Sequence, residues 1–239
     1  MTGHTDTVLS LAISGNGCLV SASWDYTIKI WNTNNGSLVK TLTGHTYVVL
    51  TLIILQNGFL ASGSWDTTIK IWNTETGSLI KTLTGHTGNL WSLAVLQNGF
   101  LASSDANGVI KIWNTDTGIL IRNITAHSGR VFCLAVANNG YLVSGGEDFK
   151  IKIWKTDTGS LIQNITAHTD WLNSLFVLPN GFVASSGSDF MIKIWNFGNL
   201  LNNASNSYST AITTSPSFTS PGYNSTIVYQ NSCKLFLKF

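Results

Sequence analysis

The chain has 239 residues and a net charge of +2 at pH 7, and only 10% of its residues are charged, against about 25% in ordinary globular domains. Its dispersed lysines and arginines argue against a nucleic-acid partner, and its longest apolar run, residues 47–55, is far shorter than the roughly 20 residues that cross a bilayer. Three scattered cysteines without metal-type spacing, and no signal sequence before the first repeat, predict a cytoplasmic protein with no membrane partner, no cofactor and no metal.

The most regular feature of the sequence is a strict period, equal to the interval between His4 and His45. Every histidine lies one period from the next one, and a tryptophan and a glycine recur at the same spacing. Periods of roughly 20 to 50 residues are typical of solenoids, propellers and other repeat arrays. The three sets are His4, His45, His86, His127 and His168; Trp31, Trp72, Trp113, Trp154 and Trp195; and Gly17, Gly58, Gly99, Gly140 and Gly181.

The second repeat predicts four short strands separated by tight turns. The first turn is expected at Asn57-Gly58, a pair that favours the two-residue type I′ turn because both of its central residues need positive φ. The second turn begins at Trp65-Asp66, and the third ends at Gly77, which supplies a permissive backbone. No segment has helical periodicity. The strands are expected at residues 47–55, 59–64, 68–72 and 78–84.

These elements predict a single all-β domain over residues 1–239. A four-stranded sheet that is buried on both faces must stack on others like it, and radial stacking leaves only short, protected edges. The predicted fold is therefore a β-propeller of four-stranded antiparallel blades, with five clear repeats over residues 1–196.

At this point the repeats resemble the WD-repeat family. A Gly-His dipeptide opens the first three copies, as in Gly44-His45, and becomes Ala-His in the last two. The Trp-Asp dipeptide that gives the family its name appears mostly as Trp-Asn, as in Trp72-Asn73, and once as Trp154-Lys155. The match covers residues 1–196.

The resemblance implies a structural hydrogen-bonded tetrad in each repeat. A tryptophan N–H can only donate, a serine hydroxyl and a neutral histidine can do both, and an ionised aspartate ends the series because it only accepts. Asn107 stands where the third repeat should have its aspartate, so it can accept but brings no charge. The expected tetrads are His4, Ser21, Asp25 and Trp31; His45, Ser62, Asp66 and Trp72; His86, Ser103, Asn107 and Trp113; His127, Ser144, Asp148 and Trp154; and His168, Ser185, Asp189 and Trp195.

The same residue types would also suit a Ser-His-Asp hydrolase. A hydrolase needs one nucleophile on an exposed, strained turn beside oxyanion donors. Here five equivalent sets recur inside strands, without a G-x-S-x-G motif. We therefore expect no catalytic residues and no enzymatic activity.

The last part of the chain, residues 197–239, is either a degenerate sixth repeat or a partly disordered tail. Shifting the register by one period aligns Gly222-Tyr223 with Gly181-Phe182, and Phe236 with Trp195. The last strand of such a repeat would be missing. The sequence therefore leaves open an incomplete ring, a fragment of a longer protein, or self-association through the incomplete last blade.

The resemblance also indicates where a partner would bind. In WD-repeat rings, the residues three and five after the histidine and the one before the aspartate look outward around the top of the channel. The corresponding positions here include all four tryptophans outside the tetrads, and Trp and Arg are enriched at interaction hot spots. The expected partner-binding residues are Trp24, Trp65, Trp91, Arg130, Phe132, Glu147 and Trp171. The full set of mapped positions also includes Thr7, Leu9, Val48, Leu50, Asn89, Ala106, Asn173 and Ser188.

The sequence therefore predicts a non-catalytic scaffold that binds a protein or peptide through the top face of a propeller. Two alternatives remain open. One is a fragment of a longer WD-repeat protein without independent activity. The other is a sugar-binding propeller, which would use the same aromatic side chains as platforms.

Overall fold

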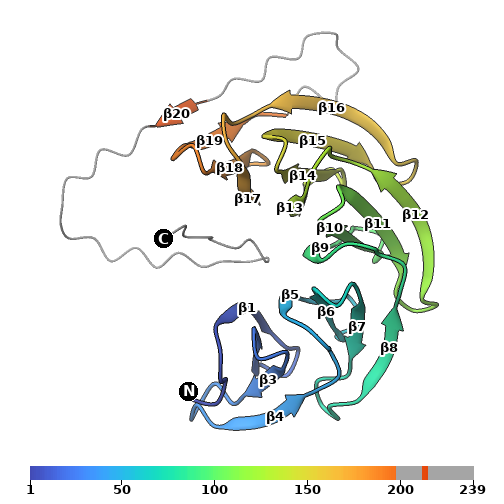
Figure 1. Ribbon diagram of the computed structural model, residues 1–239, viewed down its shortest axis with the longest axis vertical. Coiled ribbons are helices and arrows are strands. Elements are labelled where there is room, and N and C mark those ends of the chain that lie inside the picture. Colours follow the sequence, from blue (N-terminus) through green and yellow to red (C-terminus); the bar gives the residue numbers. More distant parts are fainter. Residues whose placement is uncertain (198–211, 215–239) are drawn as a thin grey trace, which may run out of the picture.

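The computed structural model describes residues 1–197 and 212–214, which form five four-stranded antiparallel sheets arranged as the blades of an arc (Figure 1). The prediction of an all-β propeller with four-stranded antiparallel blades is confirmed. The first strand of each blade lies at the inside of the arc and the fourth at the outside (Figure 1). The blades are blade 1, β1 (Val8–Ile13), β2 (Leu19–Ser23), β3 (Ile28–Trp31) and β4 (Leu38–Leu42); blade 2, β5 (Val49–Ile54), β6 (Leu60–Ser64), β7 (Ile69–Trp72) and β8 (Leu79–Leu83); blade 3, β9 (Leu90–Val95), β10 (Leu101–Asp105), β11 (Val109–Asn114) and β12 (Ile119–Thr125); blade 4, β13 (Val131–Val136), β14 (Leu142–Gly146), β15 (Lys150–Lys155) and β16 (Ser160–Thr166); and blade 5, β17 (Leu172–Val177), β18 (Val183–Gly187), β19 (Ile192–Trp195) and β20 (Ile212–Thr214).

Strand β20 shows that part of the predicted sixth-repeat segment belongs to blade 5. Ile212 pairs with Ile194, and Thr214 pairs with Ile192, so β20 is the fourth strand of that blade. The register that relates Gly222-Tyr223 and Phe236 to the fifth repeat lies outside the described residues.

The turn between the first two strands of blade 2 differs from the predicted type I′ turn. Gly58 has a φ of 83°, but Asn57 is not among the residues with positive φ. The Gly58 N–H donates to Leu55 O at 2.9 Å, and Leu55 N–H donates to Phe59 O at 2.8 Å. This is a three-residue hairpin loop in which only the glycine takes the left-handed conformation.

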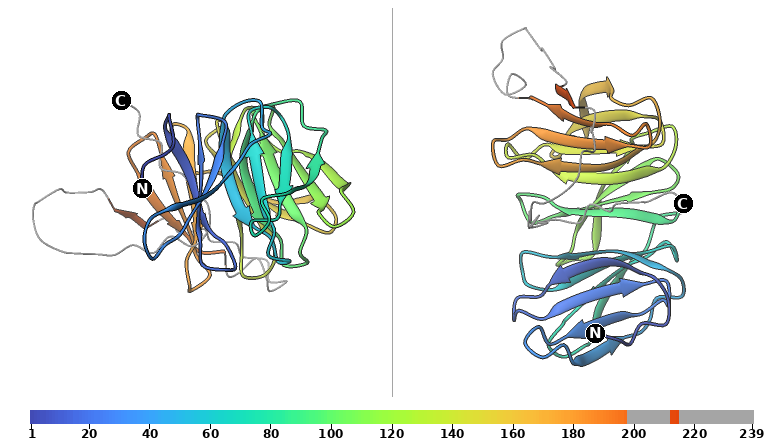
Figure 2. Two further views of the ribbon diagram at one scale, coloured as in Figure 1. Left: turned by 90° about the horizontal axis from the view of Figure 1, so that it is seen from below. Right: turned by 90° about the vertical axis from the view of Figure 1, so that its left-hand side faces the viewer.

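Neighbouring blades stack face to face (Figure 2), and clusters of buried apolar side chains lie between them. Between blades 1 and 2, for example, Ile28 and Ile30 lie in the same core cluster as Leu52 and Trp72, and all four are at most 2% exposed. The isoleucines alternate with lysine along β3, so one face of the strand enters this core. Each blade thus needs a neighbour to cover its apolar surface.

Polar bonds also connect adjacent blades. Ser10 Oγ accepts a hydrogen bond from Leu52 N–H at 3.1 Å, and Ser92 Oγ accepts the equivalent bond from Leu134 N–H, also at 3.1 Å. At the outer side, Lys81 Nζ donates to Asp116 O at 2.5 Å. The inner strands pack in the order β1, β5, β9, β13 and β17, which leaves blades 1 and 5 at the two ends of the arc (Figure 1).

Within the described part of the chain, no helix has the length and apolar character needed to span a membrane.

Candidate functional site

Blade 2 contains a relay of four hydrogen-bonded side chains. Trp72 Nε1 donates to Ser62 Oγ at 2.8 Å, and Ser62 Oγ lies 2.7 Å from His45 Nε2. On the other side of the imidazole ring, His45 Nδ1 lies 2.6 Å from a carboxylate oxygen of Asp66. The relay therefore ties β7 to β6, to the turn between them and to the loop that enters the blade.

The direction of each bond follows from which groups can donate. The Trp72 indole only donates and the Asp66 carboxylate only accepts, so His45 Nδ1 carries a proton and Ser62 donates its own to Nε2. Asp66 also accepts hydrogen bonds from the N–H and the hydroxyl of Thr68, at 2.9 and 2.7 Å. Each polar atom of the relay is thus satisfied, as buried polar groups require.

The same three bonds occur in blades 1, 4 and 5. The histidine Nδ1 lies 2.7–2.8 Å from the carboxylate, the serine Oγ lies 2.7–2.8 Å from Nε2, and the indole lies 2.7–2.9 Å from the serine. These relays are His4, Ser21, Asp25 and Trp31; His127, Ser144, Asp148 and Trp154; and His168, Ser185, Asp189 and Trp195.

The third repeat uses Asp105, and the assignment of Asn107 to this relay is wrong. His86 Nδ1 lies 2.7 Å from Asp105, which occupies the last position of β10, two residues before the position that the period indicates. The exposed Asn107 side chain instead donates to Thr87 Oγ1 at 3.0 Å. A carboxylate forms the stronger, charge-assisted bond with the imidazole N–H, so the nearby aspartate takes the place of the amide.

Burial and hydrogen bonding shift the titration of these groups. Burial disfavours the imidazolium and lowers the pKa of His86 below its ordinary value of 6.5, although the bond to Asp105 acts in the opposite direction. The same cause lowers the pKa of His127 and His168. Burial alone would raise the pKa of Asp105, but the hydrogen bonds from His86 and from two backbone N–H groups outweigh it and lower that pKa.

The relays are sealed from solvent. Ser62, Ser103 and Ser144 are each 0% exposed, and every one of them already accepts a hydrogen bond from a tryptophan. A substrate cannot reach these hydroxyls, whereas a hydrolase nucleophile must be accessible. The geometry therefore gives these five sets a structural role within the blades.

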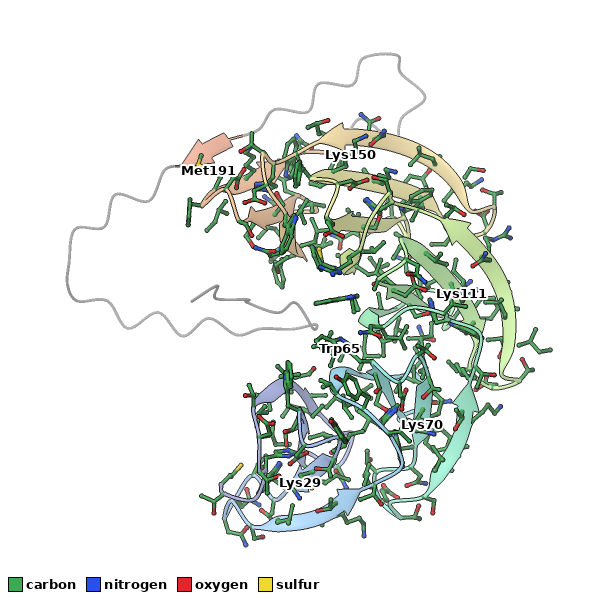
Figure 3. All side chains as sticks on the ribbon, in the orientation of Figure 1. Lys29, Trp65, Lys70, Lys111, Lys150 and Met191 are labelled. Atoms are coloured by element: carbon green, nitrogen blue, oxygen red, sulfur yellow. The ribbon has the colours of Figure 1, made fainter. Side chains whose placement is uncertain are left out.

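The residues mapped to the top face form a continuous series of ring contacts across all five blades. We call Trp24, Trp65, Trp91, Phe132 and Trp171 the aromatic row. Successive ring centroids lie 5.4, 5.7, 5.0 and 5.7 Å apart, and the contacts are edge-to-face or tilted. These are the distances and orientations that aromatic pairs favour. Figure 3 shows Trp65 close to the centre of the arc.

Two tyrosines that are not among the positions mapped to the top face extend the aromatic row at blades 1 and 2. Tyr26 stacks on Tyr47 with centroids 5.4 Å apart, and Tyr47 stacks on Trp65 at 6.0 Å. Both tyrosines are exposed, at 41% and 44%. Their positions in the sequence could have identified them, because Tyr26 directly follows Asp25 of the first relay and Tyr47 lies in the loop that enters blade 2.

The other mapped positions include a charged pair and a buried pair, whereas Thr7 is exposed and Leu9, Asn89, Ala106, Asn173 and Ser188 are half-buried. Arg130 Nη1 lies 3.6 Å from Glu147 Oε1, and Arg130 N–H donates to the same carboxylate at 3.0 Å. Val48 and Leu50, in contrast, are 0% and 1% exposed, so mapping them to an outward-looking surface was wrong. Both are aliphatic, and their burial removes apolar area from water.

Comparisons with known proteins agree with this geometry. The family described as "WD domain, G-beta repeat" matches five consecutive segments, residues 1–32, 36–73, 77–114, 118–155 and 159–196. The crystal structure of the WD40 beta propeller domain of Doa1 is similar, with 33% sequence identity and a TM-score of 0.73. The alignment covers 82% of this chain and 66% of that one, so the chain spans slightly less than two thirds of the Doa1 domain. No curated protein matches the sequence. Because the family matches cover most of the chain and follow one another at the interval of the sequence repeat, the chain belongs to the WD domain, G-beta repeat family.

Proposed function

We propose that the protein is a non-catalytic scaffold that binds a protein or peptide segment through its top face. The observation that carries this proposal is the aromatic row, which runs without interruption from Trp24 in blade 1 to Trp171 in blade 5. Trp24 is 39% exposed, and the other four rings are partly exposed. Aromatic rings dominate the energetics of protein interfaces.

The composition of this face favours an apolar or aromatic ligand over a highly charged one. Arg130 and Glu147 are the charges among the mapped positions, and they are paired with each other. A surface ion pair of this kind contributes little to binding. Recognition would therefore depend on side chains of the partner that pack against the rings, with hydrogen bonds to its backbone at the rim.

The test begins with a selection of random displayed peptides on the folded protein, followed by Kd measurements on the selected peptide. Replacing Trp65, Trp91 and Trp171 together by Ser should weaken binding by about 100-fold or more, because each hot-spot side chain contributes about 2 kcal/mol or more. Circular dichroism checks that the triple variant remains folded.

The matched control places serine at three exposed aliphatic residues on the outer strands, Leu79, Ile80 and Ile121. This variant should bind the peptide as well as the wild type does. Equal binding by both variants would contradict the proposal. Binding of the wild type to a glycan array, with no peptide selected, would favour the sugar-binding alternative instead.

A further inference from the structure

Asparagine followed directly by glycine occurs seven times in the chain. This dipeptide loses its side-chain amide more readily than other asparagine pairs, because the glycine has no Cβ to hinder the attack of its nitrogen on the asparagine side chain. The attack requires the peptide unit between the two residues to rotate until the glycine nitrogen reaches the asparagine Cγ. The seven pairs begin at Asn16, Asn35, Asn57, Asn98, Asn107, Asn139 and Asn180.

Two hydrogen bonds hold six of these pairs in place. In Asn57-Gly58, the Gly58 N–H donates to Leu55 O at 2.9 Å, and Asn57 Oδ1 accepts from the Phe59 N–H at 3.1 Å. The first bond fixes the peptide unit between the two residues, and the second fixes the asparagine side chain. The glycine N–H bonds to a preceding carbonyl at 2.8–2.9 Å, and Oδ1 bonds to the N–H two residues later at 3.0–3.3 Å, in the pairs that begin at Asn16, Asn35, Asn98, Asn139 and Asn180.

Asn107-Gly108, in the turn between β10 and β11, has neither of these bonds within the described part of the chain. Asp105 Oδ1 accepts from the Val109 N–H at 3.0 Å, and this N–H is the donor that Asn107 Oδ1 would otherwise bind. The Gly108 N–H has no acceptor among the described residues, although its counterparts in the other four repeats donate to a carbonyl three residues earlier at 3.2–3.3 Å. These counterparts are Tyr26, Thr67, Phe149 and Phe190.

The surroundings of this pair leave the reacting atoms unbonded. The Asn107 side chain is exposed, and its one hydrogen bond runs from Nδ2, the nitrogen that would leave, to Thr87 Oγ1 at 3.0 Å. Gly108 is buried because the loop that enters blade 4 lies against its Cα, where an added Cβ would collide with His127 O. The Gly108 carbonyl accepts from the N–H groups of Ala126 and His127. These contacts anchor the peptide unit after Gly108, and not the preceding unit that must rotate.

We propose that Asn107 is a site of spontaneous deamidation. The Gly108 nitrogen loses its proton to solvent and bonds to Cγ of Asn107, which closes a succinimide ring. The Cγ–Nδ2 bond breaks and the nitrogen leaves as ammonia, so the proton lost from Gly108 is balanced by the one that ammonia gains. Water then adds either to Cγ, which gives aspartate, or to the main-chain carbonyl carbon of Asn107, which gives isoaspartate.

The aspartate product would carry a carboxylate at the position where the other four repeats already have one. In those repeats the carboxylate bonds to the histidine of the relay, but Asp105 already holds His86 in the third repeat. The new charge would therefore stay at the surface, next to Ala106, one of the positions mapped to the top face. The reaction itself does not depend on the aromatic row. The four aspartates are Asp25, Asp66, Asp148 and Asp189.

Peptide mapping of the full chain, stored at mildly alkaline pH and sampled over time, tests this site. Liquid chromatography with mass spectrometry detects the mass gain of an acid over an amide, and fragment ions assign it to each of the seven asparagines. Asn107 should react at least about 10-fold faster than the other six, because each of those must first break the two bonds that hold it. In urea all seven should react at similar rates, since the fold no longer distinguishes them.

Two variants complete the test. Asn107→Gln should abolish the fast reaction, because the longer side chain closes a ring far less readily. The matched control, Asn98→Gln, changes a pair that is held by both bonds and should leave the fast reaction unchanged. A reaction at Asn107 in the folded chain that is no faster than at the other six, or a fast reaction that survives in Asn107→Gln, would overturn the proposal.

Discussion

Asp105 provides the negative charge of the third relay from a position inside a strand. It and His86 have side chains that are each 1% exposed, and it also accepts hydrogen bonds from the N–H groups of Asn107 and Val109 at 3.0 Å. Removal of the carboxylate would leave these donors without an acceptor inside the blade. Such a loss costs more than the net energy of a single hydrogen bond.

We therefore expect Asp105→Ala to lower the free energy of unfolding by about 1–3 kcal/mol. Asn107→Ala is the matched control, because its exposed side chain bonds only to Thr87 and should change stability by less than about 0.5 kcal/mol. Urea denaturation of both variants measures the difference. A larger loss of stability from Asn107→Ala than from Asp105→Ala would mean that Asn107, and not Asp105, belongs to the relay.

The relays also predict loss of stability in acid. Burial lowers the pKa of His86, His127 and His168 in the folded protein, so the unfolded chain binds protons first as the pH falls through 6.5. Stability should therefore be fully present above that value and fall below it. The pKa values of Asp105, Asp148 and Asp189 are lowered from 3.8 in the folded protein. Stability should therefore fall a second time as the pH decreases through 3.8, where the unfolded chain begins to bind protons at these carboxylates.

The measurement is the urea midpoint at about pH 7.5, 5.5 and 3.5, and we expect it to decrease at each step. His86→Asn should show a smaller change between the first two values than the wild type, because one titrating group has been removed. A midpoint that rises on acidification would contradict the proposed cause.

Sequence periodicity identified most members of the relays because each relay forms within a single repeat. It misplaced the third aspartate because hydrogen bonding depends on reach in space, and Asp105 reaches the imidazole from two residues earlier. It could indicate the top face but not the contacts of the aromatic row. Trp91 and Trp171 sit at different offsets within their repeats, so their common row depends on how the blades are arranged.

At the scale of the strands and turns, the loop between β1 and β2 shows why one glycine of a repeat is needed. Gly17 has a φ of 81°, and its N–H donates to Ser14 O at 2.9 Å to close the hairpin. A Cβ added at Gly17 would meet no atom within 4 Å, and the same is true of Gly15, whose φ is not positive. The two glycines therefore differ in backbone conformation and not in available space.

We expect Gly17→Ala to destabilise the protein by about 1–2 kcal/mol, because an L-residue in the left-handed conformation is strained. Gly15→Ala should be neutral or slightly stabilising, since it restricts the unfolded chain without a comparable strain. Thermal unfolding of the two variants checks this. Equal melting temperatures would mean that the loop changes conformation to accept the alanine.

The strands were predictable because their aliphatic runs and turn residues repeat five times, and in blade 2 each observed strand lies within its predicted range. The turn type was not predictable in the same way. Asn-Gly suits both a two-residue loop with two positive φ values and a three-residue loop with one, and the structure has the second. The position of β20 could not be predicted from the repeat either, because residues 197–239 lack the Gly-His, Ala-His and Trp-Asn dipeptides that mark the other repeats.

At the scale of the whole molecule, and among the residues that the structure describes, blades 1 and 5 each pack against one other blade, whereas blades 2 to 4 each pack against two. The stability of a repeat protein is approximately the sum of the intrinsic stability of each unit and the energy of its interfaces. Strands β1–β4 and β17–β19 should therefore exchange their amide hydrogens faster than strands β5–β16.

Hydrogen exchange followed by mass spectrometry tests this gradient. Peptides from β9–β12 in the central blade should be the slowest. Uniform protection across all five blades would instead indicate a single cooperative unit.

All four members of a relay come from the same copy of the repeat, and none is borrowed from an adjacent blade. A genetic event that adds or deletes one whole unit would therefore leave every remaining relay intact, and would merely create a new junction with the same apolar chemistry as the old ones. The number of blades can drift in such a lineage without requiring a new interior to evolve, while each duplication brings another loop whose residues are free to diverge toward a different ligand.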